Sequence, residues 1–327
     1  MKLRTSLQDE LSAAVPGRVR FEEPMRLHTS FHIGGPAEIW VEPQSPEELR
    51  RLLQIAAEAQ LPVTLVGAGA NLLVRDEGIP GLVLHLSGAG FQTFRETEEG
   101  VVAGAALPLE WLIRRAEEAS LSGVEFLAGV PGHVGGAVRM NAGTHDDEGQ
   151  FHHFGDVIHS VRVMELDGQI RLLPAEAIDF AYRSTDLNGR IVLEATLNLQ
   201  PDDRRAIAQR VRRLWEFKKR TQDWSAPSVG CIFKNSQERG AAGWMIDQVG
   251  LKGYRVGGAL VSTQHANFML NTGSARASDV FALIEEARAR VRRKFDVELE
   301  LEVQVLPVRP ARPGNESDRR AGELVEG

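Results

Sequence analysis

The segment PSVGCIFKN, residues 227–235, contains Cys231, the only cysteine of the 327-residue chain. A thiol has a pKa of about 8.5, so it is mostly protonated at neutral pH. One role open to it is structural, because cysteine also serves as a small buried hydrophobic residue. A single cysteine cannot form an internal disulfide bond, which indicates a reducing compartment.

Two glycine-rich segments could bind an anion through backbone N–H groups. In VTLVGAGANLLV, Gly67 and Gly69 follow an expected strand, but the third glycine of the dinucleotide fingerprint is missing. A turn and another strand follow instead of the helix that a Rossmann motif requires. The segment is therefore either a tight turn with positive φ or a phosphate-binding loop.

The second segment, LAGVPGHVGGAVRMNAGTH at residues 127–145, contains five glycines. Successive backbone N–H groups in such a segment can form a concave site for a diphosphate. The alternative is a crowded junction between a helix and a strand. Two glycine-rich loops in one β-rich region favour a single extended dinucleotide held by the backbone.

The elements that must position these segments are strands with a few helices between them. Ser45 as N-cap, Pro46 at the first helical position and Glu48 in a capping box predict the start of one helix. Apolar residues at helical spacing predict others at 107–120, 202–220 and 277–295. Short β-rich runs, among them VIHSVRVMEL, IVLEATLNL and VELELEVQV, predict strands. The irregular alternation indicates an α+β fold.

Composition excludes several classes of protein. A net charge of −7 argues against a general nucleic-acid binder, and the basic run at 212–220 is a solvated helix face or a phosphate attractor. Acidic residues interrupt the N-terminus where a signal peptide would be apolar, and no run is long enough to span a membrane. We therefore expect a soluble, cytoplasmic protein.

Seven motifs occur in a recognisable order. They are TSFHIGGPAEIWV, GAGANLLV, AGVPGHVGGAVRMNAG, DFAYRS, PSVGCIFKN, AAGWMIDQVGLKGYRVGGALVSTQHANFMLN and LELEV. From about residue 20 to 307 the chain resembles the UDP-N-acetylenolpyruvoylglucosamine reductase family, the flavoenzymes of bacterial peptidoglycan precursor synthesis. The short link after Tyr182 and Arg183 resembles the family's second type, which lacks a long tyrosine-bearing loop.

The resemblance implies an FAD-binding domain of the PCMH type, like that of vanillyl-alcohol oxidase, and a smaller α+β substrate-binding domain. The expected boundaries are 1–20 for an N-terminal helix or extension, 21–200 for the flavin domain with subdomains 21–86 and 87–200, 201–307 for the substrate-binding domain, and 308–327 for a disordered tail.

The resemblance also implies non-covalent FAD, with NADPH as hydride donor. The residues expected to line FAD are Gly67, Gly69, Asn71, Leu72, Gly129, Pro131, Gly135, Gly136, Asn141, Ala142 and Gly143. The segment 144–156 contains His145, Asp147, His152 and His153, but their spacing fits no standard metal site. We expect a solvated loop there and no metal.

By this resemblance, hydride passes from NADPH to the flavin and then to the enolpyruvyl group of UDP-N-acetylglucosamine enolpyruvate. Arg183 would be the cation at the substrate carboxylate, Glu302 would assist there or relay protons, and Cys231 would protonate the substrate carbon where most relatives carry serine. The residues expected to bind substrate are Tyr182, Lys234, Asn235, His265 and Asn267. We expect a monomer.

Pattern alone allows different roles for two of these residues. Arg183 could be a strand-end arginine paired with Asp179 or Asp186. Glu302 could belong to one solvated face with Glu298 and Glu300, because these residues alternate with apolar ones.

Two other functions remain open on the sequence alone. One is an FAD-dependent alcohol or sugar oxidase of the same fold, in which His133 could anchor the flavin covalently. The other is a non-catalytic nucleotide-binding or regulatory protein, which would need neither Cys231 nor Arg183.

Overall fold

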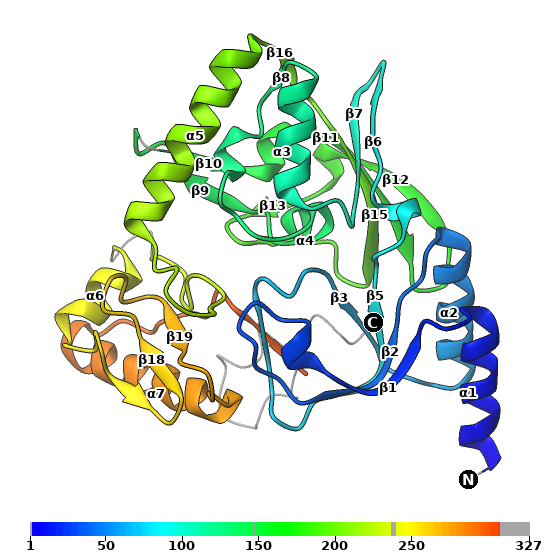
Figure 1. The fold of residues 1–327 in the computed structure, drawn as a ribbon, viewed down its shortest axis with the longest axis horizontal. Helices are drawn as coiled ribbons and strands as arrows, with labels where there is room; N and C mark the ends of the chain where they lie inside the picture. The colour runs from blue at the N-terminus through cyan, green and yellow to red at the C-terminus, as the bar shows by residue number, and fades with distance from the viewer. Residues whose placement is uncertain (1, 147, 237–239, 308–327) are drawn as a thin grey trace.

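The computed structural model describes residues 2–146, 148–236 and 240–307 (Figure 1). Two sheets occupy the N-terminal and middle parts of the chain, and a C-terminal group of helices and strands lies beside them. The expected disordered tail, 308–327, lies outside the described residues. None of the helices in the described ranges is long and apolar enough to cross a membrane.

The N-terminal sheet has four strands in the order β1-β2-β5-β3. Strands β2, β5 and β3 are parallel, and β1 is antiparallel to β2. Two helices, α1 and α2, lie beside the sheet, and Leu11 and Leu52 join its core. The elements are α1 (Lys2–Ala14), β1 (Val19–Pro24), β2 (Pro36–Val41), α2 (Pro46–Glu58), β3 (Val63–Val66), β4 (Leu72–Val74) and β5 (Ile79–His85).

Helix α2 begins as its sequence predicts. The Ser45 side chain accepts a hydrogen bond from the Glu48 backbone N–H at 3.3 Å, and Pro46 is the first helical residue. The Glu48 carboxylate accepts a hydrogen bond from Gln44 N at 2.7 Å rather than from Ser45, and it also pairs with Arg18 at 2.7 Å. The capping signal therefore predicted the start of α2 correctly, although the Glu48 carboxylate bonds Gln44 N instead of the Ser45 N–H that a capping box requires.

The middle sheet has five antiparallel strands in the order β12-β11-β15-β7-β6. Helices α3 and α4 pack beside it, and their apolar residues, such as Leu112 and Val138, belong to the same core as Val161 and Ala195. The elements are β6 (Phe94–Thr97), β7 (Gly100–Gly104), α3 (Leu109–Glu118), α4 (Val134–Arg139), β11 (Ile158–Glu165), β12 (Ile170–Pro174) and β15 (Arg190–Leu197).

Short strands and 3-10 turns connect the main elements of the N-terminal and middle regions. Three two-stranded pairs, β8 with β16, β9 with β10, and β13 with β14, lie outside the two sheets. These elements are β8 (Leu121–Ser122), β9 (Gly143–His145), β10 (Phe151–His153), β13 (Phe180–Ala181), β14 (Ser184–Thr185), β16 (Gln200–Pro201), η1 (Met25–Leu27), η2 (Ala89–Phe91), η3 (Glu125–Leu127), η4 (Phe154–Val157) and η5 (Ala175–Ala177).

The C-terminal group has its own core, in which residues from 229 to 303 pack together with Phe31 and Leu73 of the N-terminal region. The Asp76 carboxylate accepts a hydrogen bond from Ala277 N at 2.9 Å, at the first residue of α7. Both contacts tie the group to the N-terminal region. The elements are α6 (Ala242–Gln248), β17 (Arg255–Val256), β18 (Ala259–Val261), β19 (Met269–Asn271), α7 (Ala277–Phe295) and β20 (Gln304–Leu306).

Helix α5 (Arg204–Thr221) leads from the middle region to the C-terminal group (Figure 1). Its Leu214 belongs to the core that the N-terminal and middle regions share, so the helix packs against those regions. The strand expected over VELELEVQV is wrong for residues 297–303, which form no strand. Only β20 is a strand, and it pairs in parallel with β4, because the chain leaves the C-terminal group here and returns to the N-terminal region.

Candidate active site

Arg183 lies in the two-residue turn between β13 and β14. Its φ is 61°, in the left-handed region that arginine seldom adopts and that is often found at functional sites. The Asn141 amide donates a hydrogen bond to Ala181 O at 3.0 Å and so holds the strand that enters the turn. The arginine side chain is directed inward and is only 16% exposed.

Two groups fix the Arg183 guanidinium. Its Nη1 donates a hydrogen bond to Gly143 O at 2.5 Å, and its Nε lies 2.7 Å from Glu302 Oε1 in an ion pair. Within the described ranges no group accepts a hydrogen bond from Nη2, so this nitrogen can bind a ligand carboxylate. Arg183 therefore pairs with Glu302 rather than with Asp179 or Asp186.

Glu302 does not belong to a solvated face. Glu298 and Glu300 are exposed, but the Glu302 side chain is only 16% exposed. Burial raises the pKa of the Glu302 carboxyl, and the neighbouring Arg183 guanidinium acts in the opposite direction. The carboxyl therefore keeps a proton at a higher pH than an exposed glutamate does.

Backbone contacts from two other segments place Glu302. Its N–H donates to Ile232 O at 2.9 Å, one residue after Cys231. Its carbonyl accepts a hydrogen bond from the Asn71 amide at 3.0 Å. The Asn71 side chain, which we expected to line FAD, thus links the first glycine-rich segment to Glu302.

Cys231 lies in an isolated bridge with Phe268 and is half-buried. Burial, with a smaller contribution from Glu302, raises the pKa of the Cys231 thiol to about 12, although Arg183 acts in the opposite direction. This pKa is above the ordinary value of a free thiol. The thiol is therefore protonated throughout the neutral range, and it lies close enough to Arg183 and Glu302 to interact with both.

Two aromatic rings line the arginine. The Arg183 guanidinium carbon is 5.2 Å from the Tyr182 ring centroid and 5.7 Å from that of Phe151, and the two rings are 6.0 Å apart. Burial raises the pKa of the Tyr182 hydroxyl, which also interacts with Glu302 and Cys231. Tyr182 therefore faces the same site, and Phe151 is a site residue that the sequence analysis missed.

Lys234 and Asn235 follow Cys231 at the edge of the site. Lys234 Nζ forms an ion pair with Glu300 at 2.7 Å, and its side chain is 21% exposed. Asn235 is exposed, and its side chain accepts a hydrogen bond from Ala242 N at 3.1 Å at the start of α6. Both side chains already have protein partners, which a ligand would have to share or displace.

His265 and Asn267 have different surroundings. His265 is half-buried, its Nδ1 has no hydrogen-bond partner among the described residues, and burial lowers its pKa. Asn267 is 2% exposed, and its amide bonds both N and O of Phe233, at 2.9 and 2.8 Å. We therefore propose that Asn267 positions the Cys231 segment rather than binding substrate.

At two positions of the glycine-rich segments, neither the backbone conformation nor the packing of the protein requires glycine. Gly67 and Gly136 have ordinary φ values, and a Cβ on either would meet nothing within 4 Å. By contrast, a Cβ on Gly69 would lie 2.0 Å from His28 O, and one on Gly143 would lie 2.6 Å from the Phe151 ring. Gly69 and Gly143 are thus needed for packing, whereas Gly67 and Gly136 leave room for a ligand.

The other residues expected to line FAD lie in the same two segments. Asn141 is 3% exposed, and its side chain is hydrogen-bonded to Ala181 O and Gly155 N. It therefore supports the Arg183 turn. Four more occupy strand, turn or helix positions: Leu72 begins β4, Gly129 and Pro131 precede α4, and Gly135 lies in its first turn. Ala142 immediately precedes β9.

Two short strands, β9 and β10, pair across the segment 144–156. The Asp146 carboxylate accepts a hydrogen bond from His152 at 2.9 Å. The described residues contain no group of three or more acidic, histidine or cysteine side chains that could hold a metal. Asp147, one of the residues weighed as a metal ligand, lies outside them. The prediction of a solvated loop did not include the pairing of β9 with β10 or the packing of Phe151 against Arg183.

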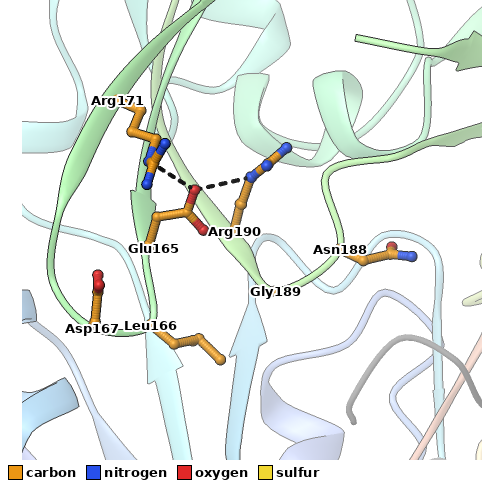
Figure 2. A pocket seen from close by; sticks show the side chains of 7 residues that line it. All are labelled: Glu165, Leu166, Asp167, Arg171, Asn188, Gly189 and Arg190. Atoms are coloured by element: carbon orange, nitrogen blue, oxygen red, sulfur yellow. Dashed lines mark hydrogen bonds and ion pairs between the residues drawn. The ribbon is translucent and has the colours of Figure 1, made fainter. Parts of the chain in front are cut away.

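A surface hollow of about 390 Å³ lies at the turn between β11 and β12 (Figure 2). Glu165 Oε1 lies 3.3 Å from Arg171 Nε and 3.2 Å from Arg190 Nε, so both arginines of the hollow pair with one glutamate. The hollow contains none of the residues gathered around Cys231. We assign it no function. Its lining residues are Glu165, Leu166, Asp167, Arg171, Asn188, Gly189 and Arg190.

Two family models match the chain. Residues 37–173 match the FAD binding domain, and residues 222–306 match the C-terminal domain of UDP-N-acetylenolpyruvoylglucosamine reductase. UDP-N-acetylenolpyruvoylglucosamine reductase 2 of Symbiobacterium thermophilum is 42% identical over 93% of this chain and 95% of its own length. The Bacillus subtilis reductase is 36% identical over 91% of this chain and 97% of its own. The chain belongs to this reductase family.

A solved structure agrees with this assignment. The crystal structure of the reductase from Thermus caldophilus covers 89% of this chain and 99% of its own, at 37% identity and a TM-score of 0.75. The predicted family, the α+β flavin fold, the oxidoreductase class and the FAD cofactor are thereby confirmed.

The open space at Gly67 and Gly136 fits an FAD that approaches the backbone closely. Gly136→Ala is expected to weaken FAD binding by about tenfold or more, roughly 1.4 kcal/mol. The same change should stabilise the apoprotein by about 0.5–1 kcal/mol, because alanine replaces glycine within α4. Flavin fluorescence titration and thermal unfolding of the apoprotein measure the two effects. Unchanged FAD affinity would remove the first turn of α4 from the FAD site.

Proposed function

We propose that the protein reduces UDP-N-acetylglucosamine enolpyruvate to UDP-N-acetylmuramate, a peptidoglycan precursor, with NADPH as hydride donor and non-covalent FAD. The observation that carries the proposal is the meeting of Arg183, Cys231 and Glu302, which come from three separate segments. When bound, FAD supplies the hydride chemistry, taking a hydride from NADPH and passing it to the terminal enolpyruvyl carbon.

Arg183 stabilises the negative charge that hydride addition creates. This charge develops on the neighbouring carbon and spreads into the substrate carboxylate. The Arg183 Nη2 is available to bind the substrate carboxylate. Gly143 and Glu302 hold the guanidinium in place, so it needs little reorganisation during the reaction. Glu302, with its raised pKa, orients the guanidinium and can relay a proton.

Cys231 supplies the proton that completes the reduction. Its thiol is protonated at neutral pH, and a carbanion beside a carboxylate is basic enough to take that proton. One hydride and one proton then add across the carbon–carbon double bond. The resulting thiolate lies beside Arg183 and recovers a proton from Glu302 or solvent.

The substrate's remaining groups lie around this centre. We propose that Tyr182, Lys234, Asn235 and His265 contact the sugar nucleotide, because they border the Cys231 segment or face it. We further propose that the enzyme is a cytoplasmic monomer that acts on this small molecule and binds neither nucleic acid nor membrane.

The test is turnover of NADPH by FAD-loaded protein with and without the enolpyruvyl substrate. We expect NADPH consumption that depends on the substrate, formation of UDP-N-acetylmuramate, and release of the flavin on acid precipitation. Flavin retained in the acid pellet, with rapid oxygen reduction and no response to the substrate, would favour the oxidase. His133 would then be the anchor to examine, because its Nδ1 is buried without a partner among the described residues.

A further inference from the structure

The basic run on α5 contains one lysine that is not solvated. Arg212, Arg213, Lys219 and Arg220 are exposed, as expected for a helix surface, but Lys218 is only 2% exposed. A lysine is seldom buried unless an anion or several hydrogen bonds compensate the loss of hydration.

The protein itself compensates Lys218 only in part. Its Nζ donates one hydrogen bond, to Phe126 O at 3.2 Å, although an ammonium has three donors. In the parts of the chain that the structure describes, no carboxylate pairs with it. Burial, together with a smaller effect of the nearby Arg183 guanidinium, lowers the pKa of Lys218 to about 7. The charged form of Lys218 thus lacks a neighbouring anion among the described residues, and a bound anion would stabilise it.

Lys218 contacts the start of the second glycine-rich segment, and its charge interacts with that of Arg183. A Cβ on Gly129 would be 3.1 Å from Lys218 Cδ and 2.7 Å from the Trp215 ring, so α5 packs directly on the start of that segment. Arg183 interacts with Lys218 electrostatically. Gly136, where the backbone leaves space for the cofactor, lies seven residues after Gly129 along the same segment.

We propose that Lys218 supplies the positive charge that offsets the negative charge gained by the bound flavin on reduction. This inference rests on the proposed function, which requires the reacting end of FAD to lie beside the substrate held by Arg183. A lysine that contacts the second glycine-rich segment and interacts with Arg183 then lies beside the flavin ring system. Its interaction with the reduced flavin is stronger than with the neutral oxidised flavin, so it favours reduction.

The charges balance in this scheme. A C–H bond of NADPH breaks, its hydride forms an N–H bond on the flavin, and NADP⁺ leaves. The flavin then carries one additional negative charge, mainly on its pyrimidine ring, which the Lys218 ammonium neutralises without transferring a proton. When the hydride passes to the substrate, the flavin returns to its neutral oxidised form.

The test is the midpoint potential of the bound FAD, measured by reductive titration against a reference dye, without NADPH or substrate. In Lys218→Met the affinity for reduced over oxidised FAD should fall by about 10- to 100-fold, which lowers the potential by about 30–60 mV. Lys218→Arg should keep most of the potential. The matched control is Lys219→Met, which removes an exposed charge from the next position and should leave the potential unchanged.

Lys218→Gln provides a second neutral variant if the methionine protein does not load FAD. An unchanged potential in a folded, FAD-loaded neutral variant would overturn the inference. If that variant instead binds the enolpyruvyl substrate at least tenfold more weakly, Lys218 serves the substrate and not the flavin. A wild-type protein that binds no FAD would overturn the proposed function itself.

Discussion

Replacing Cys231 by alanine is expected to slow reoxidation of the reduced flavin by the enolpyruvyl substrate by roughly 10²–10⁴-fold, the usual effect of losing a general acid. Binding of FAD and its reduction by NADPH should change little, because neither requires the thiol proton. Anaerobic stopped-flow absorbance at the flavin band measures the two half-reactions separately.

Cys231→Ser is the matched control for this prediction. Serine is close to cysteine in size and carries a proton, so it should recover much of the lost rate. A buried structural cysteine would behave differently: both variants would be less stable, and both half-reactions would slow to a similar extent. Reoxidation of the alanine variant at the wild-type rate would show that another group donates the proton.

Replacing Arg183 by methionine is expected to lower the rate of hydride transfer to the substrate by roughly 10²–10³-fold, as for other fixed groups that stabilise developing charge. Substrate affinity should fall as well, because the carboxylate loses its cation. Glu302 would be left buried without its partner, so its pKa should rise further. Single-turnover stopped-flow measurements over a range of substrate concentrations separate rate from affinity.

Arg183→Lys serves as the comparison, since lysine keeps the charge but loses the planar fork that binds Gly143 and a carboxylate together. We expect partial recovery of affinity and less recovery of rate. A methionine variant with full single-turnover rate would show that Arg183 only supports the turn between β13 and β14.

Local signals in the sequence predicted the helices well. Ser45 and Pro46 fixed the start of α2, and apolar residues at helical spacing gave α3, α5 and α7. These signals depend on residues within one helical turn of each other. Contacts with the rest of the protein therefore did not override them. The strand pattern failed at residues 297–303 because only Leu301 forms a bridge there, to Phe233, so no continuous ladder of hydrogen bonds forms along the segment.

The pairing of Glu302 with Arg183 in the candidate active site could not be predicted from the sequence pattern alone. Glu298, Glu300 and Glu302 alternate identically in the sequence, yet only Glu302 is drawn inward, where it pairs with Arg183 and bonds Asn71. Only the family resemblance selected it. Phe151 and Lys218 were missed because a hydrophobic residue in a polar loop and one lysine in a basic run give no local signal of burial.

The most direct test of the proposed reaction is a single turnover without oxygen. The FAD-loaded protein is first bleached with one equivalent of NADPH and then mixed with UDP-N-acetylglucosamine enolpyruvate. We predict that the oxidised flavin absorbance returns and that one equivalent of UDP-N-acetylmuramate forms. Flavin that stays reduced after this addition, and is reoxidised only when oxygen is admitted, would contradict the proposal.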